Sequence, residues 1–250
     1  MQNLEQLQNI IACQPYPLLF STISGAHLYG FASADSDWDL RGVHILPIAE
    51  VIGLYPIRET IELSEIKDNL EIDLVTHDLK KFFSLLLKRN GYVLEHIYSP
   101  LIVFTTPEHE ELKAIATNCI TRHHSHHYLG FAKTQWKLFL KQELKKVKPL
   151  LYVYRALLTG IYLMQTGKIE ANLVQLNQEF NLSYLPDLIA QKTENKEKAI
   201  LKDADLEFYQ QECDRLTEKL EIAASKTNLP DLPSAKSALN DLLTRIRIAS

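Results

Sequence analysis

The stretch that decides the fold lies at residues 24–42 and reads SGAHLYGFASADSDWDLRG. A short apolar run, Leu18–Ile23, precedes it, and Gly25 follows that run almost at once. This order predicts a strand that turns through the glycine into a short helix. The motif Asp37-x-Asp39 then opens a second strand, in which successive side chains point to opposite faces. Asp37 and Asp39 are therefore predicted to share one face, roughly 6.6 Å apart by backbone rise.

A third acid, Asp73, lies between apolar neighbours in the strand-like run 70–75. Burying a lone carboxylate is costly, and carboxylates that approach one another repel unless a cation lies between them. Divalent ions such as Mg²⁺ and Mn²⁺ prefer oxygen ligands, and two such ions can hold both reacting oxygens of a phosphoryl displacement. Asp37, Asp39 and Asp73 therefore predict a two-metal catalytic site. The alternative is that Asp35, Ser36 and Asp37 merely cap a turn while Asp39 is solvated on an edge strand.

The two halves of the chain differ in their hydrophobic pattern. Up to residue 106, strand-like runs alternate with helical spacing at Asp78–Lys88, which indicates a sheet with helices. From residue 107 onward, long stretches with helical spacing are punctuated by prolines. The predicted fold class is therefore α+β, with a catalytic domain of mixed sheet and helices at 1–106 and a helical, substrate-binding domain at 107–250. The charged segment 195–202 predicts a loop or a frayed helix end.

Composition limits the possible functions. The 250 residues are 46% hydrophobic and 23% charged, as in ordinary globular proteins. No apolar run approaches the roughly 20 residues of a membrane span, and the N-terminus lacks the features of a signal peptide, so a cytoplasmic protein without membrane contact is expected. Three separated cysteines without a C-x-x-C pair disfavour a disulfide framework. Because the net charge is −4, nucleic-acid binding would require a local basic patch.

Such a patch is predicted in the second half. Lysines recur there every four residues, and on a helix they would form one basic stripe of Lys133, Lys137, Lys141 and Lys145. The stripe is suited to following the phosphates of RNA, although lysine runs are also common on solvated helix faces.

A second group in that half, Lys148, Tyr152 and Arg155, falls on one helix face at positions i, i+4 and i+7. Arginine suits bidentate phosphate binding and tyrosine suits base stacking, so these residues are candidates for nucleotide binding. The alternative is that Tyr152 is a core residue and that Arg155 pairs with an acid.

These motifs resemble the signature of the DNA polymerase β-like nucleotidyltransferases. More narrowly, Tyr29-Gly30, Ser36-Asp37-x-Asp39 and Arg41-Gly42 resemble the RlaP group, predicted nucleotidyltransferases associated with RNA-repair gene neighbourhoods. The resemblance extends over roughly residues 21–167 and continues at Asn90-Gly91, Leu94-Glu95, Ser99-Pro100, Lys148-Pro149, Tyr152 and Arg155.

The resemblance implies transfer of a nucleotidyl group from an NTP such as ATP to a hydroxyl, with two Mg²⁺ or Mn²⁺ ions. Asp37 and Asp39 would bind both ions, and Asp73 would bind the catalytic ion and help to deprotonate the acceptor. Ser24, Gly25 and Ala26 would form the turn that binds the triphosphate.

One of these positions departs from the family. Ala26 stands where the family usually has serine, and a lost hydrogen bond to a charged phosphate costs about 1.5–3 kcal/mol. Ser24 is a possible substitute donor, and backbone N–H groups remain. Arg41, two residues beyond Asp39, is expected either to neutralise the acids or to contact the substrate.

The expected acceptor is an RNA end in RNA repair or processing. Two alternatives remain open. An antitoxin-type adenylyltransferase would modify a protein acceptor instead, and a catalytically degenerate module would bind nucleotide or RNA without metal-dependent release of pyrophosphate.

Overall fold

The computed structural model describes residues 2–67, 69–195, 199–201 and 205–249. The contacts between residues divide the chain into two compact units. The first unit comprises Met1–Gly25, Asp37–Cys119 and Leu232–Ser250, and the second comprises Ala26–Ser36 and Ile120–Asp231. The units do not coincide with the ranges 1–106 and 107–250 expected from the sequence.

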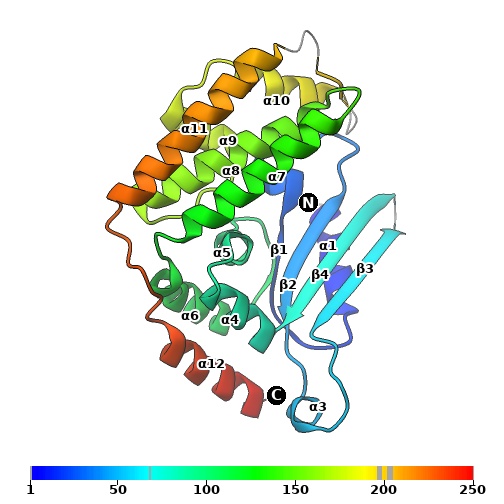
Figure 1. The fold of residues 1–250 in the computed structure, drawn as a ribbon. Coiled ribbons are helices and arrows are strands. Elements are labelled where there is room, and N and C mark those ends of the chain that lie inside the picture. The colour runs from blue at the N-terminus through cyan, green and yellow to red at the C-terminus, as the bar shows by residue number, and fades with distance from the viewer. Residues whose placement is uncertain (1, 68, 196–198, 202–204, 250) are drawn as a thin grey trace. The chain divides into compact units, whose positions relative to one another are not determined.

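The first unit is built on a mixed five-stranded sheet with the strand order β3-β4-β2-β1-β5 (Figure 1). Its strands are β1 (Leu18–Ile23), β2 (Trp38–His44), β3 (Thr60–Lys67), β4 (Leu70–Asp78) and β5 (Ile102–Thr105). Strands β2 and β4 run parallel, and the other neighbouring pairs run antiparallel. The parallel pair lies in the middle of the sheet, next to the antiparallel β1.

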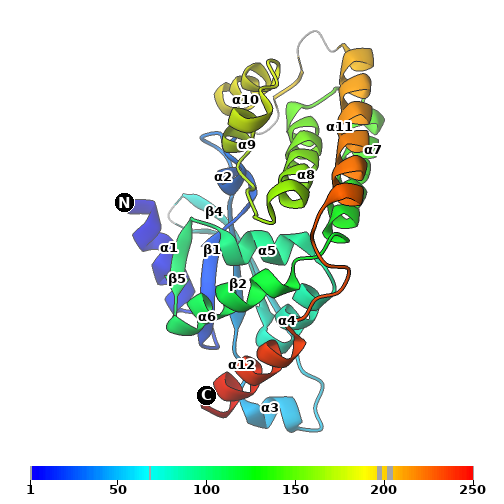
Figure 2. The same cartoon turned by 90° about the vertical axis from the view of Figure 1, so that its left-hand side faces the viewer.

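Helices cover both faces of this sheet (Figure 2). Helix α1 (Gln2–Ala12) packs on one face, where Leu7 and Ile10 join a buried cluster that includes Leu40, Ile72 and Leu74. Side chains alternate along a strand. The residue before Leu40 on β2 and the residue between Ile72 and Leu74 on β4 therefore point to the opposite face. That face therefore receives Asp39 and Asp73.

The opposite face carries α4 (Leu79–Leu87), α5 (Gly91–Tyr98) and α6 (Pro107–Ala116). Phe20 of β1 contacts Phe82 of α4 edge to face and stacks on His109 of α6, with ring centroids 5.6 Å and 4.1 Å apart. The unit also contains the short elements α3 (Ile48–Ile52) and η1 (Thr117–Cys119), and the C-terminal helix α12 (Lys236–Ala249).

Helix α12 joins the first unit through a buried ion pair. Arg247 donates hydrogen bonds to both carboxylate oxygens of Asp78, at 2.8 and 2.9 Å, and a further bond to the carbonyl of Leu46. Asp78 also accepts from the N–H of Lys80 and so caps α4. The pairing joins the C-terminal helix to the end of β4, although more than 150 residues separate them in sequence.

The second unit is helical. It contains α2 (Gly25–Tyr29) apart from its first residue, and five longer helices: α7 (His124–Lys141), α8 (Val147–Thr166), α9 (Leu173–Phe180), α10 (Leu185–Glu194) and α11 (Leu206–Lys226). Helix α8 is buried along most of its length and packs against α7, α9, α10 and α11. It ends at Gly167, whose φ of +70° gives the left-handed turn that commonly stops a helix.

The predicted α+β class is confirmed, with a mixed sheet followed by a helical region. Asn90-Gly91, a pair that commonly ends a helix, does not end one here. Asn90 is instead the N-cap of α5, and its side chain accepts a hydrogen bond from the N–H of Tyr92 at 3.0 Å. Residues 196–198 and 202, in the segment expected to be a loop, lie outside the described residues. Among the residues described, no helix is both long and apolar enough to cross a membrane.

Candidate active site

Asp39 and Asp73 lie side by side at the start of the parallel strand pair. They are Cα partners in the ladder of β2 and β4, and neighbouring strands are about 4.8 Å apart. Their side chains are 18% and 42% exposed, so both carboxylates reach the surface. Asp37 precedes β2, which begins at Trp38, so the strand alternation expected for Asp37 and Asp39 does not extend to Asp37.

Arg41 is the shared partner of the two carboxylates. Its Nη2 donates to Asp39 Oδ1 at 2.7 Å and to Asp73 Oδ2 at 3.0 Å. Its Nη1 donates to the carbonyl oxygens of Leu40 at 2.9 Å and Asp73 at 2.6 Å. Of the two roles expected for Arg41, neutralising the acids is the one for which the structure shows the contacts.

Gly25 is packed directly against the Asp39 carboxylate. A Cβ on Gly25 would lie 1.8 Å from Asp39 Oδ2 and 2.6 Å from its Cγ, and the φ of Gly25 is +60°. The neighbouring N–H of Ser24 donates to the carbonyl of Asp39 at 2.8 Å. Only glycine fits a position with both this backbone conformation and this contact. The glycine is therefore required to place a carboxylate, in addition to the phosphate contact expected from the sequence.

The donor chemistry at this point suits a divalent metal, but the arrangement is incomplete. Carboxylate oxygens are the ligands that Mg²⁺ and Mn²⁺ favour, and Asp39 and Asp73 supply them from adjacent strands. In the part of the chain that the structure describes, no three His, Cys, Asp or Glu side chains form a group able to hold a metal. Asp37 is thus not gathered with the other two acids, and the guanidinium of Arg41 lies between the pair.

Comparison with known proteins identifies the family of the chain. The family model described as RlaP, the RNA repair pathway DNA polymerase beta family, matches residues 1–245. The chain belongs to this family. The resemblance seen in residues 24–42 is therefore confirmed over nearly the whole chain.

The similar proteins have limited overlap with this RlaP-family chain. An uncharacterized protein from Methanocaldococcus jannaschii is 34% identical over 154 residues, which cover 62% of this chain and 63% of that protein. The uncharacterized protein YcgL from Bacillus subtilis is 27% identical over 170 residues, or 66% of this chain and 64% of that one. The chain thus spans less than two thirds of either relative. A nucleotidyltransferase-like protein of known structure from Exiguobacterium sibiricum aligns over all of this chain and 80% of its own at 14% identity, with a TM-score of 0.35.

Arg41 of the RlaP-family chain lies close enough to two histidines for its charge to lower their pKa values. Burial lowers the pKa of His96 on α5 to about 3, and the charge of Arg41 acts in the same direction. Burial also lowers the pKa of His77 on β4, with smaller contributions from Lys81 and Arg41. Both imidazoles are therefore neutral at pH 7, so Arg41 is the charged member of this group.

The second unit brings together Lys148, Tyr152 and Arg155 on one face of α8, as their spacing predicts. The Lys148 ammonium lies 5.9 Å from the Tyr152 ring centroid. Arg155 is completely buried, and its guanidinium carbon lies 4.1 Å from the centroid of Tyr29 and 5.5 Å from that of Phe131. The arginine is enclosed by aromatic rings. Ala26, also expected to take part in nucleotide binding, is buried in this unit.

Lys192 is a residue that sequence analysis missed. It is completely buried, and its Nζ donates to Ser33 Oγ at 2.7 Å. Ser33 in turn donates to Asp35 Oδ1 at 2.8 Å, and its N–H bonds to Ser36 Oγ at 3.0 Å. The network orders the turn at 33–36, which leads by chain connection into Asp37. No sequence signal separates Lys192 from ordinary surface lysines.

The basic stripe is shorter than expected. Lys133, Lys137 and Lys141 are exposed along α7, which ends at Lys141. Lys145 lies beyond the helix, and its Nζ donates to the carbonyl oxygens of Leu140 and Gln142 at 2.8 and 2.6 Å. Including Lys145 in a helical stripe was therefore wrong, because its ammonium satisfies carbonyl groups at the C-terminus of α7.

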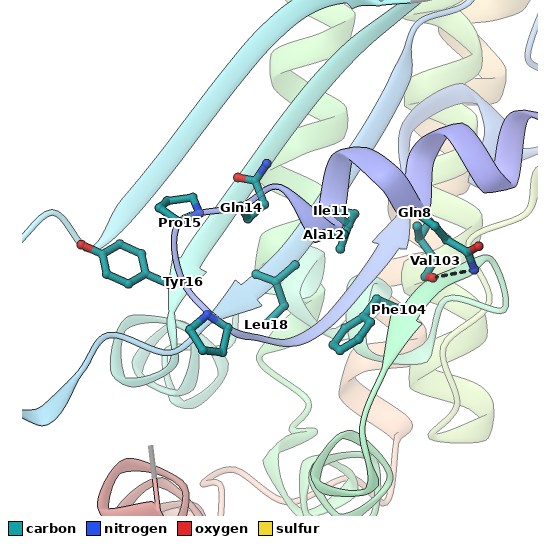
Figure 3. Close-up of a pocket in the computed structure, with 10 residues that line it drawn as sticks. Gln8, Ile11, Ala12, Gln14, Pro15, Tyr16, Leu18, Val103 and Phe104 are labelled. Carbon is teal, nitrogen blue, oxygen red and sulfur yellow. Dashed lines mark hydrogen bonds between the residues drawn. The ribbon is translucent and has the colours of Figure 1, made fainter.

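A separate pocket of about 520 Å³ lies beside α1 and the edge strand β5 (Figure 3). Gln8 closes one side by donating from Nε2 to the carbonyl of Val103 at 3.3 Å. Its lining includes Ile11 and Leu18, which belong to the buried cluster under α1. The pocket is therefore on the face of the sheet opposite to the carboxylates, and none of its lining residues is a predicted site residue.

Proposed function

We propose that the chain is a metal-dependent nucleotidyltransferase that moves a nucleoside monophosphate from an NTP to an acceptor hydroxyl at an RNA end. One observation carries the proposal: in a chain of the RNA-repair polymerase β family, Asp39 and Asp73 are in register on adjacent strands, and Asp39 lies against a glycine that admits no side chain. Both carboxylates are partly exposed, as residues that meet a substrate must be.

Each of the three acids has a proposed role, and the structure brings two of them, Asp39 and Asp73, together on adjacent strands. Asp37, Asp39 and Asp73 would hold Mg²⁺ or Mn²⁺, which when bound neutralises phosphate charge and favours the ionised form of the acceptor hydroxyl. Asp73, the more exposed of the strand pair, takes the proton of that hydroxyl. The oxygen forms a bond to the α-phosphorus, the bond from that phosphorus to the β-phosphate oxygen breaks, and pyrophosphate leaves. The chain supplies positioning and charge neutralisation, with no covalent intermediate.

Other residues have supporting roles in the proposal. The turn at Ser24 and Gly25 brings backbone close to the Asp39 carboxylate and is the proposed contact for the triphosphate. Lys148, Tyr152 and Arg155 remain predicted nucleotide-binding residues. The exposed lysines Lys133, Lys137 and Lys141 are the proposed RNA contacts, because they repeat at helical spacing on one solvent-facing side.

The test incubates the protein with each NTP labelled at the α-phosphate, with Mg²⁺ or Mn²⁺, and with RNA whose 3′ end is either a hydroxyl or a deoxy block. Label should enter the RNA with the free hydroxyl. Asp73→Asn should reduce incorporation by at least about 1,000-fold, the scale of loss for a group that acts in the transition state. The matched control is Glu71→Gln, because Glu71 is an exposed acid two residues earlier on the same strand and face.

Each other outcome has a defined meaning. Label transferred to protein and not to RNA would replace the RNA acceptor by a protein acceptor and keep the transferase. Nucleotide binding without metal-dependent pyrophosphate release would overturn the enzyme assignment in favour of a binding module. Equal losses in Asp73→Asn and Glu71→Gln would remove Asp73 from the reaction.

A further inference from the structure

The Arg41 guanidinium lies between Asp39 and Asp73, the two carboxylates that would hold a metal ion under the proposed function. One nitrogen, Nη2, bonds to Asp39 Oδ1 and Asp73 Oδ2 at 2.7 and 3.0 Å. Two carboxylates held in register on neighbouring strands repel each other, and a cation between them offsets that repulsion. Arg41 is that cation.

The second guanidinium nitrogen has partners that do not depend on either carboxylate. Nη1 donates to the backbone carbonyls of Leu40 and Asp73, at 2.9 and 2.6 Å, and these belong to strands whose ladder holds them in place. Arg41 can therefore release a carboxylate from Nη2 and still keep bonds to the sheet through Nη1. The side chain is 20% exposed, so the contacts at Nη2 are within reach of ions from solvent.

We propose that Arg41 is a built-in counter-ion that competes with divalent metal for Asp39 and Asp73. The inference rests on the proposed function, because it concerns the loading of the same site. Positive charges a few ångströms apart repel strongly, so an ion that enters between the carboxylates displaces Nη2 from at least one of them. Arg41 thereby keeps the acids converged before metal binds and sets the metal concentration at which the site fills.

The test measures Mn²⁺ binding to the intact chain without nucleotide, by electron paramagnetic resonance of free Mn²⁺, in the wild type and in Arg41→Gln. The dissociation constant for Mn²⁺ should fall by at least about fivefold in Arg41→Gln, since a cation beside the ligands is removed. Arg41→Lys should give a smaller shift, because its ammonium keeps the positive charge but cannot bridge the carboxylates and also hold both carbonyls. If Arg41→Gln does not fold, the comparison of Arg41→Lys with the wild type still tests the proposal. Arg245→Gln is the matched control, since it removes an exposed arginine paired with Glu111 in the same unit.

A second measurement follows thermal unfolding with a chelator and with Mg²⁺. Without metal, Arg41→Gln should unfold at a lower temperature than the wild type, because Asp39 and Asp73 then repel without a counter-ion. Mg²⁺ should raise its midpoint more than it raises that of the wild type, by mass action.

The outcomes separate this inference from the proposed function. Weaker or unchanged Mn²⁺ binding in Arg41→Gln would overturn competition, and weaker binding would make Arg41 a permanent support for the ligands. If Asp39→Asn abolishes Mn²⁺ binding in that same experiment, the metal site itself stands. If Asp39→Asn leaves Mn²⁺ binding unchanged, the metal site fails, and the proposed function fails with it.

Discussion

Each end of the parallel β2–β4 pair carries an ion pair between arginine and aspartate, but the two ion pairs differ in exposure and in net charge. At the first end, Arg41 is shared between Asp39 and Asp73, and the three side chains are 20%, 18% and 42% exposed. At the far end, Arg247 forms an ion pair with one aspartate, Asp78, and the two side chains are 8% and 1% exposed. The first end has two negative charges to one positive, whereas the second is balanced.

The difference shows what each end is built to do. The buried Arg247–Asp78 pair carries no net charge, so it does not attract a further ion. Removing one partner would leave the other charge buried away from water. A partly exposed arginine shared by two acids leaves one net negative charge, which attracts a further cation from solvent. The same type of contact therefore fixes α12 at one end and leaves a net negative charge at the other, where the proposed metal would bind.

The largest expected effect comes from breaking the balanced end. Asp78→Asn should lower the free energy of unfolding by about 3–5 kcal/mol, because Arg247 would stay buried without its counter-charge. Urea denaturation measures this. Glu110→Gln is the control, since it breaks the Lys113–Glu110 pair, whose Glu110 side chain is 64% exposed, and it should change the free energy of unfolding far less than Asp78→Asn does. Equal losses in the two variants would contradict the contrast drawn between the ends.

The next effect concerns the exposed end and the glycine behind it. Gly25→Ala should lower nucleotidyl transfer by about 100-fold, because the new Cβ would displace the Asp39 carboxylate and misplace a reacting group. The free energy of unfolding should fall by about 1–2 kcal/mol, since alanine disfavours the left-handed backbone. Gly130→Ala is the opposite case: its Cβ would meet no atom within 4 Å on α7, and it should stabilise by roughly 0.5–1 kcal/mol. Wild-type activity in Gly25→Ala would show that Asp39 need not be held in this position.

The smallest effect is a pH dependence at the balanced end. His44, the Cα partner of Asp78, is buried, and desolvation lowers its pKa from 6.5 to about 4. The unfolded chain binds a proton at a pH where the folded chain does not, so stability is complete above about pH 6.5 and is lost as the pH falls toward 4.

Unfolding free energies measured between pH 7 and pH 4 should therefore decline less steeply in His44→Gln than in the wild type. His126→Gln replaces an exposed histidine of α7 and should leave the slope unchanged. A wild-type slope in His44→Gln would assign the acid sensitivity to other groups, of which the buried His109 is the first candidate, because burial lowers its pKa to about 4 as well.

Much of the fold was predictable where the signal is local. Strand β1 occupies its predicted range and helix α4 lies within the predicted range 78–88, because an apolar run and a helical repeat are both properties of a few consecutive residues. Helix α5 was missed at Asn90, which suits a helix start or a helix stop. The left-handed Arg89, with φ +65°, ends the preceding turn and leaves Asn90 to cap the next helix.

The sequence by itself determined the fold class and the family, and it led to the proposed catalytic acids, because the order of glycine, Asp-x-Asp and a later Asp is written along the chain. Only the tertiary structure decided that β2 lies parallel to β4, and hence that Asp39 and Asp73 share Arg41. It also decided that Lys192 orders the turn before Asp37 and that Arg247 neutralises Asp78. The physical reason is distance along the chain: a charge finds its partner through strand pairing and helix packing, and those contacts join residues that no local pattern connects.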